Sequence, residues 1–208
     1  MDIQFYGANC VVLTIKGQRF VLDDNLAELG AKSVLKPGDI ALYSGAHTKP
    51  TVETKLVIDY PGEYEAANVS IYGIAAQAHM DEAGKQTATM YKIINGGVSV
   101  LLAGHIYPDL SDSQLEAIGM IDVMVIPVGG NGYTLDPIGA QKVIRAVEPK
   151  LVVPVHYADK ALNFPVPQQD LDNALKELAM EPQEHVAKLR VKESDLSDLT
   201  QLIVIDKS

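Results

Sequence analysis

The chain has one cysteine among its 208 residues, no tryptophan, and few cationic side chains. Because Cys10 is the sole cysteine, an internal disulfide framework is excluded. Lysine and arginine number 17 against 27 aspartate and glutamate residues, which gives a formal net charge of −10. A surface this acidic argues against broad binding to the phosphate backbone of nucleic acid, so we expect no nucleic-acid partner.

Long hydrophobic runs are also missing. No apolar stretch approaches the roughly 18 residues of a membrane-spanning helix. The opening MDIQFYGANC carries acidic and amide side chains where a signal peptide has basic ones. The sequence therefore predicts a cytoplasmic protein without a membrane partner. The length suits one hydrophobic core, and we expect a single domain over residues 1–208.

The pattern of expected elements changes halfway along the chain. Short apolar strands separated by turn residues come first, as in CVVLTI, GDIALYS and VSIYGIAAQ. Later, apolar strands alternate with helical stretches. One is SDSQLEAIGM, with Ser111 as its N-cap, and another is LDPIGAQKVIRAVEPK, with Asp136 as N-cap and Pro137 at its first position. Hairpins followed by β-α-β-α units favour two sheets with helices on their outer faces.

Four of the five histidines share one sequence context. His47, His79, His105 and His156 each lie at or just beyond the carboxyl end of an apolar strand, whereas His185 lies in a polar run and is interpreted as a surface residue. Strand ends that meet at one edge of a sheet are common positions for sites, and neutral imidazole binds zinc, iron, copper or nickel. A single strand-end histidine is more often structural. The residues alone therefore leave a metal site and its absence equally open.

Three stretches resemble the metallo-β-lactamase-fold superfamily: DYPGEYE, IPVGGNGYTLDP and EPKLVVPVHY. They are most similar to its small metal-dependent hydrolase branch, which is related to ascorbate-6-phosphate lactonase. The opening MDIQFYGANCVVLTIKGQRFVLDD also resembles that branch, so the similarity runs over almost the whole chain. The resemblance implies an α/β fold, a four-layer αββα sandwich, which agrees with the order of expected elements.

The family's Thr/Ser-His-x-His-x-Asp-His motif is degenerate in this chain. It falls on SGAHTKP, where only the second histidine, His47, is kept and Lys49 occupies the aspartate position. The family's next histidine matches His79, its late histidine matches His156, and His105 replaces its bridging aspartate. The resemblance thus implies that these four histidines hold one divalent transition metal, zinc being favoured, where relatives hold two.

Two functions stay open at this stage. One is a metal-dependent hydrolase of a small ester, lactone or phosphoester with a remodelled, mononuclear site. The other is a non-catalytic relative that keeps the fold for ligand binding or assembly. The catalytic candidates are Lys49 as a contact for an anionic substrate, Glu63 as a base, and Asp136 in the cleft. Each also has a structural interpretation, as a loop lysine, a turn residue and a helix cap. The expected partner is a small, anionic molecule, and a homo-oligomer stays open.

Overall fold

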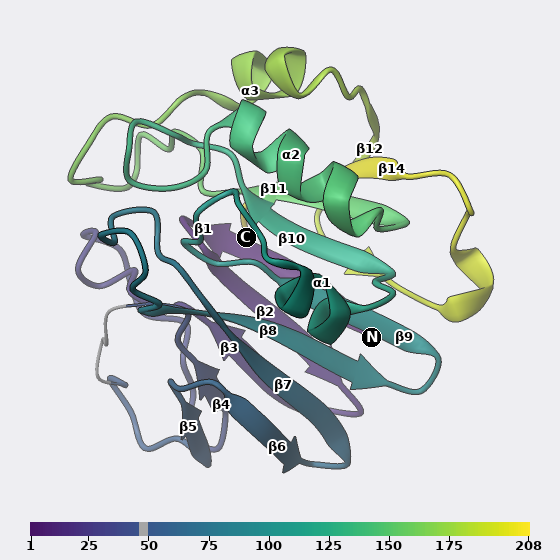
Figure 1. Ribbon diagram of the computed structural model, residues 1–208. Helices are drawn as coiled ribbons and strands as arrows, with labels where there is room; N and C mark the ends of the chain where they lie inside the picture. Colours follow the sequence, from purple (N-terminus) through teal and green to yellow (C-terminus); the bar gives the residue numbers. More distant parts are fainter. Residues whose placement is uncertain (46–49) are drawn as a thin grey trace.

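Two β-sheets pack face to face in the computed structural model, which describes residues 1–45 and 50–208 (Figure 1). The predictions for His47 and Lys49 therefore lie outside the described residues. Within them, the smaller sheet has six strands, in the order β13 (Leu189–Arg190), β1 (Asp2–Gly7), β2 (Cys10–Ile15), β3 (Gln18–Leu22), β4 (Ile40–Leu42) and β5 (Leu56–Ile58). The larger sheet has eight over the same described ranges, in the order β12 (Pro182–Val186), β14 (Gln201–Ile205), β11 (Leu151–Val155), β10 (Val123–Pro127), β9 (Val98–Leu102), β8 (Ala88–Asn95), β7 (Val69–Ala76) and β6 (Gly62–Ala66).

The strand directions bring several carboxyl ends to one edge of the eight-stranded sheet. Strands β9, β10 and β11 are parallel. Because β8 is antiparallel to both β7 and β9, β7 points the same way as these three. His79, His105 and His156 follow β7, β9 and β11 respectively, so all three histidines come to this edge.

In the six-stranded sheet, the carboxyl ends of β1, β3 and β4 lie on the same side of the molecule as this edge. Backbone hydrogen bonds join the two sheets there. The N–H of His156 donates to the carbonyl oxygen of Ala8 at 2.9 Å, and the N–H of Thr89 donates to that of Ser44 at 2.8 Å. These bonds fix the end of β11 against the end of β1. The loop after β4 is likewise held against β8, so the edge is continuous across both sheets.

Alternating apolar side chains fill the space between the sheets, as the period-2 pattern of the strands requires. They are buried residues from both sheets, including Leu13, Phe20, Ile71, Tyr91, Val125 and Val153. Tyr91 is fully buried, and its hydroxyl lies 2.8 Å from the carbonyl oxygen of Tyr43 and 3.1 Å from that of Ile58. The Tyr91 hydroxyl on β8 is thus a hydrogen-bond partner for backbone carbonyl groups at the end of the smaller sheet.

The α-helices pack on the outer face of the eight-stranded sheet (Figure 1). They are α1 (Asp112–Ile118), α2 (Pro137–Val147) and α3 (Leu171–Leu178). The predicted starts of the first two are confirmed. Ser111 forms a capping box with Gln114, and Asp136 caps α2 with Pro137 at the first helical position.

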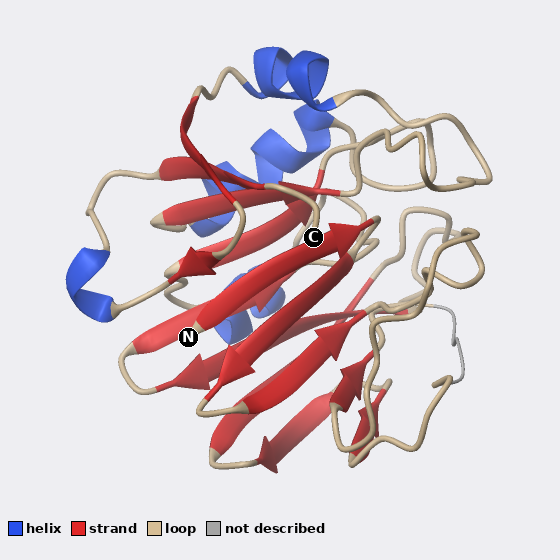
Figure 2. Cartoon of the chain, turned by 180° about the vertical axis from the view of Figure 1, so that it is seen from behind, coloured by secondary structure: helices blue, strands red, loops and turns tan. Residues whose placement is uncertain are grey.

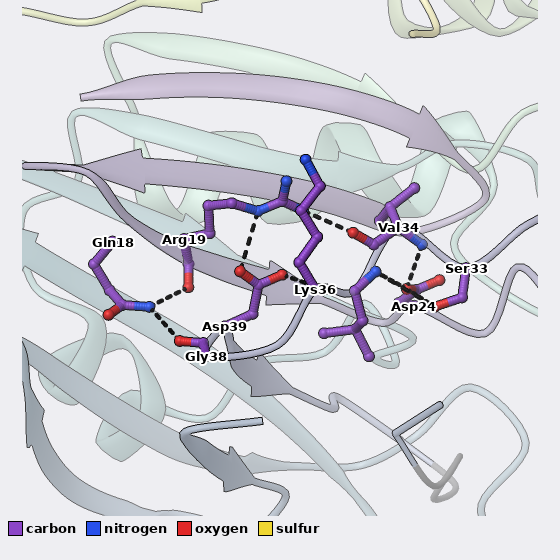
Figure 3. Close-up of polar contacts among 9 residues, drawn as sticks. Gln18, Arg19, Asp24, Ser33, Val34, Lys36, Gly38 and Asp39 are labelled. Carbon is purple, nitrogen blue, oxygen red and sulfur yellow. Dashed lines mark hydrogen bonds and ion pairs between the residues drawn. The ribbon is translucent and has the colours of Figure 1, made fainter. Parts of the chain in front are cut away.

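The described part of the chain has no α-helix on the outer face of the six-stranded sheet, and the loop segment after β3 packs on part of this face (Figure 2). Outward-facing side chains of β2, β3 and β4 pack under apolar residues of the segment after β3: Cys10, Val12, Val21 and Ala41 under Leu26, Leu29 and Leu35. Figure 3 shows the polar contacts that hold this segment. Asp24 accepts hydrogen bonds from the N–H groups of Val34 and Leu35, and Arg19 donates to the carbonyl oxygen of Val34 at 2.8 Å.

One strand differs from the sequence expectation. The polar run containing His185 forms β12, which pairs in parallel with β14 at the border of the eight-stranded sheet. Its side chains are largely exposed, so the run lacks the apolar alternation that predicts a strand. His185 itself is exposed, as expected, and lies 3.7 Å from Asp206. None of the described helices has both the length and the apolar composition needed to cross a membrane.

Candidate metal site

Three of the four predicted histidines lie together at the joined edge of the sheets. The backbone N–H of His79 donates to the carbonyl oxygen of His105 at 2.9 Å, which couples the segments that follow β7 and β9. The rings of His105 and His156 meet edge to face, with their centroids 4.8 Å apart and their planes at 82°. The fourth, His47, lies outside the described residues.

His156 is held in an enclosed position directly after β11. Its backbone is left-handed, with φ at 54°, and only 1% of the residue is exposed. The ring lies 5.2 Å from that of Phe164, and its Nδ1 is 3.1 Å from Oε1 of Gln168. Burial lowers the pKa of His156 to about 4, while hydrogen bonds with the residue's own backbone and with Gln168 oppose the shift. The imidazole is therefore neutral at pH 7.

His105 is the second neutral imidazole. Burial lowers its pKa to about 3, and the nearby His156 and His79 lower it further. The ring of Tyr133 stands edge-on to it at a centroid distance of 5.2 Å. Tyr133 follows β10. The side chains grouped at His105 thus come from the segments after three parallel strands, β9, β10 and β11.

His79 contributes an unpartnered ring nitrogen. Its Nδ1 is buried and has no hydrogen-bond partner among the described residues, and its ring lies 5.9 Å from that of Tyr107. A buried polar atom without a partner is uncommon in proteins and calls for a ligand or a water molecule. Together with two neutral imidazoles, this nitrogen gives a donor set of the kind that zinc and related metals prefer.

Among the described residues, however, no group of three histidine, cysteine, aspartate or glutamate side chains converges closely enough to hold a metal ion. The imidazole donors are of the chemical type that binds a transition metal. The described residues supply the close pair His105 and His156 and the neighbouring nitrogen of His79. The described residues are therefore consistent with a metal in the type of their donor atoms.

A buried carboxylate, Asp23, lines a cavity together with His105 and was not among the residues predicted from the sequence. Asp23, directly after β3, accepts hydrogen bonds from Ser44, at 2.7 Å from the backbone N–H and 2.5 Å from Oγ. Burial raises the pKa of Asp23 to about 6, although the Ser44 hydrogen bonds lower it. Asp23 shares the strand-end context of the histidines, and extending that criterion to carboxylates would have found it.

A small cavity opens between Asp23 and His105. Its volume is about 120 Å³, and its walls are Asp23, Asn25, Glu28, Tyr43, Gly45, His105 and Tyr133. The Tyr43 hydroxyl is buried and has no hydrogen-bond partner within the described ranges. The cavity walls thus include two carboxylates, Asp23 and Glu28, two phenols, Tyr43 and Tyr133, and the neutral imidazole of His105.

Neither catalytic candidate within the described residues, Glu63 or Asp136, forms a hydrogen bond or ion pair with the histidine pair. Glu63 is exposed on β6, where it pairs across to Tyr72, and makes no hydrogen bond or ion pair with the three described histidines. The Oδ1 of Asp136 accepts the N–H of Gly139 at 2.6 Å as the cap of α2. The structure therefore supports the helix-cap interpretation of Asp136. Lys49 lies outside the described residues.

A family model for the beta-lactamase superfamily domain matches residues 2–156. The chain belongs to this superfamily. The UPF0173 metal-dependent hydrolase of Thermoplasma acidophilum is 28% identical over 144 residues, which are 66% of this chain and 52% of that relative. A UPF0173 metal-dependent hydrolase of Thermococcus onnurineus is 33% identical over 133 residues, which are 62% and 56% of the two chains. The chain thus aligns with little more than half the length of these curated relatives.

Solved structures agree with the family and the fold. A Thermotoga maritima protein, described as a candidate Zn-dependent hydrolase of the metallo-beta-lactamase superfamily, superposes with a TM-score of 0.78 at 25% identity, covering 99% of this chain and 98% of that one. Igni18, a metallo hydrolase of Ignicoccus hospitalis, superposes with a TM-score of 0.64 at 16% identity, covering 99% and 94%. The predicted superfamily and α/β fold class are confirmed. In the present superfamily member, the described residues form no α-helix on the outer face of the six-stranded sheet.

Proposed function

We propose that this superfamily member binds one divalent transition metal, zinc being favoured, and hydrolyses a small anionic ester, lactone or phosphoester. The observation that carries the proposal is the close pair of neutral imidazoles, His105 and His156, at a sheet edge that also holds His79. Metal ligation requires the neutral form of histidine, and burial supplies it here. The metal-dependent hydrolase relatives support the same activity.

The residues at the edge have separate tasks in this proposal. His105 and His156 hold the metal, with His79 and His47 completing the set. A bound zinc ion supplies a water of pKa about 7 and an electrophilic centre. Asp23 fixes Ser44 through two hydrogen bonds and so positions the start of the loop that leads to His47. The cavity between Asp23 and His105 receives the uncharged ester or lactone group of the substrate, because the Asp23 and Glu28 carboxylates in its wall would repel an anionic one.

The proposal is tested by metal titration followed by activity. Purified protein stripped with chelator should bind one equivalent of Zn²⁺ or Co²⁺, and His105→Ala or His156→Ala should lose that binding. His185→Ala is the matched control, because His185 is exposed on β12 beside Asp206. Wild-type protein that binds no zinc, cobalt, iron, manganese or nickel would overturn the proposal.

A non-catalytic role is the second candidate, and two observations favour it. The motif positions of relatives are occupied here by Gly45, Lys49 and Pro50, and no group of three donors converges among the described residues. In that case the 120 Å³ cavity binds a ligand without turnover. Thermal stability unaffected by chelator, together with no hydrolysis across ester, lactone and phosphodiester panels, would establish this alternative over the first.

A further inference from the structure

The amide group of Gln168 faces the imidazole of His156 in a defined orientation. Its Nε2 donates to the carbonyl oxygen of Val166 at 3.0 Å. Because that side of the amide is occupied by a carbonyl acceptor, it must be the donor side, and Oε1 is left to face the ring. Oε1 lies 3.1 Å from Nδ1 of His156. An amide oxygen only accepts hydrogen bonds, so the nitrogen opposite it must carry the proton.

The segment that carries Gln168 is fixed to the loop after β10. The N–H of Gln169 donates to the carbonyl oxygen of Gly129 at 2.9 Å, and the N–H of Ala158 donates to that of Gln169 at 2.8 Å. These backbone bonds set the distance between Gln168 and the end of β11. The amide of Gln168 is thus held in place by two backbone hydrogen bonds of the next residue, Gln169.

Gly129 allows this close approach. A Cβ at Gly129 would lie 2.1 Å from the carbonyl oxygen of His156 and 2.3 Å from Oε1 of Gln168. Both distances are far below van der Waals contact, and the first obstacle is backbone that cannot swing away. Any side chain at this position would therefore displace the amide of Gln168 or the backbone of His156.

We propose that Gln168 is a positioning residue that selects the tautomer of His156. Its Oε1 accepts the proton of Nδ1–H and leaves the lone pair of the ring on Nε2, as outer partners of ligating histidines do. A metal or another electrophilic ligand is therefore met by Nε2. Only this last consequence rests on the proposed metal site, because the tautomer is a property of the metal-free chain.

The tautomer is measured directly by long-range ¹H–¹⁵N correlation spectra of ¹⁵N-histidine-labelled, metal-free protein. We expect His156 of the wild type to carry its proton on Nδ1. Gln168→Leu, which keeps the side-chain size but removes the acceptor, should shift the ring towards the Nε2–H form. Gln168→Glu keeps an acceptor and should restore Nδ1–H. The matched control is Gln169→Leu, since the side chain of Gln169 bonds to Glu177 and not to the ring.

Gly129→Ala provides a second variant that leaves the amide itself intact. It should weaken the same hydrogen bond by displacement and shift the tautomer in the direction of Gln168→Leu. Wild-type protein with the proton on Nε2 would overturn the proposal. A His156 ring unchanged in a folded Gln168→Leu variant would overturn it as well.

Zinc affinity separates this proposal from the proposed function. Removing an outer-shell partner lowers metal affinity about 10–100-fold, so we expect that loss in Gln168→Leu and recovery in Gln168→Glu. If the wild type binds no metal while the tautomer still depends on Gln168, the positioning role stands and the metal-site proposal falls. If zinc binds equally well to wild type and Gln168→Leu, the consequence drawn for Nε2 is wrong.

Discussion

The imidazole rings of His105 and His156 meet edge to face at a centroid distance of 4.8 Å. Two imidazolium ions at this distance would repel one another, and burial prevents that by lowering the pKa values to about 3 and about 4. The rings come from the ends of two strands separated by β10. Sheet topology thus creates the pair, and burial keeps both members in the neutral form that can act as a ligand.

The first prediction concerns acid stability of the metal-free protein. Folding depresses the pKa of both histidines, so the unfolded chain binds more protons than the native state between pH 6.5 and about 4. Stability present above pH 6.5 should be lost as pH falls through this window, by about 3 kcal/mol for His156 alone. Urea unfolding at a series of pH values, with chelator present, measures the loss. His156→Gln should flatten the profile, and an equally steep profile in that variant would contradict the assignment.

The second prediction concerns Asp23, whose pKa is raised from 3.8 to about 6. For a carboxyl group with a raised pKa, the native state binds more protons than the unfolded chain, so stability falls as pH rises from about 4 to 6. The shift corresponds to about 3 kcal/mol at pH 7. Asp23→Asn removes the titration, and its stability relative to wild type should improve by that amount between pH 4 and pH 7. Comparing the two proteins at each pH cancels the opposite contribution of the histidines.

Ser44→Ala provides the complementary measurement at Asp23. The Ser44 hydroxyl donates to Oδ2 and favours the ionised carboxylate. Removing it should move the midpoint of the Asp23 transition to higher pH, as read from ¹³C chemical shifts of the carboxyl group. A midpoint that stays in place or falls would show that the hydroxyl is not what stabilises the charge.

Local signals in the sequence predicted the parts of this protein that depend on local physics. Ser111 and Asp136 indicated helix starts because an N-cap can be recognised from about four consecutive residues. The strand-end position of His79, His105 and His156 also followed from the chain alone. Contacts between residues far apart in the sequence could not be predicted in this way. Nothing in the sequence near Asp23 shows that it bonds to Ser44, 21 positions away.

The exposed strand β12 was missed for a similar reason. Its polar residues show no apolar alternation. The strand forms because its backbone can pair with the edge of the neighbouring strand β14. The role of Gln168 depends on a contact with His156 across a loop of 12 positions, which spacing does not encode. The loop covering of the six-stranded sheet likewise depends on the contacts of Asp24 and Arg19.

The third prediction concerns Gly104, whose backbone is left-handed with φ at 67°. A Cβ there would lie 2.4 Å from both Cβ and Oγ of Ser44, so Gly104→Ala combines backbone strain with a steric clash. Gly38→Ala is the matched control, since Gly38 has φ at 84° and open space around the added methyl group. We expect Gly38→Ala to cost about 1 kcal/mol and Gly104→Ala to cost about 1–3 kcal/mol more. Denaturant unfolding of both variants measures the difference, and equal losses would show that Ser44 moves aside freely.

The fourth prediction concerns the segment that covers the six-stranded sheet. One oxygen of Asp24 accepts three hydrogen bonds, from Ser33 Oγ at 2.7 Å and from the N–H groups of Val34 and Leu35 at 2.7 and 2.8 Å. Asp24→Ala leaves the N–H of Val34 without its acceptor and the N–H of Leu35 with only Ser33 Oγ at 3.3 Å, at a cost of about 2–4 kcal/mol. Ser33→Ala removes only the hydroxyl and should cost about 1 kcal/mol. Thermal unfolding of both variants ranks the losses.

Amide hydrogen exchange shows which parts of the protein lose stability in the Asp24→Ala variant. If the covering segment is held mainly by this carboxylate, exchange at Val34 and Leu35 should accelerate strongly, while β10 and β11 in the far sheet keep their protection. Exchange that accelerates equally in all strands would mean that the segment unfolds only together with the core. The covering layer would then be an integral part of the sandwich, stabilised by the packing of Leu26, Leu29 and Leu35 more than by Asp24.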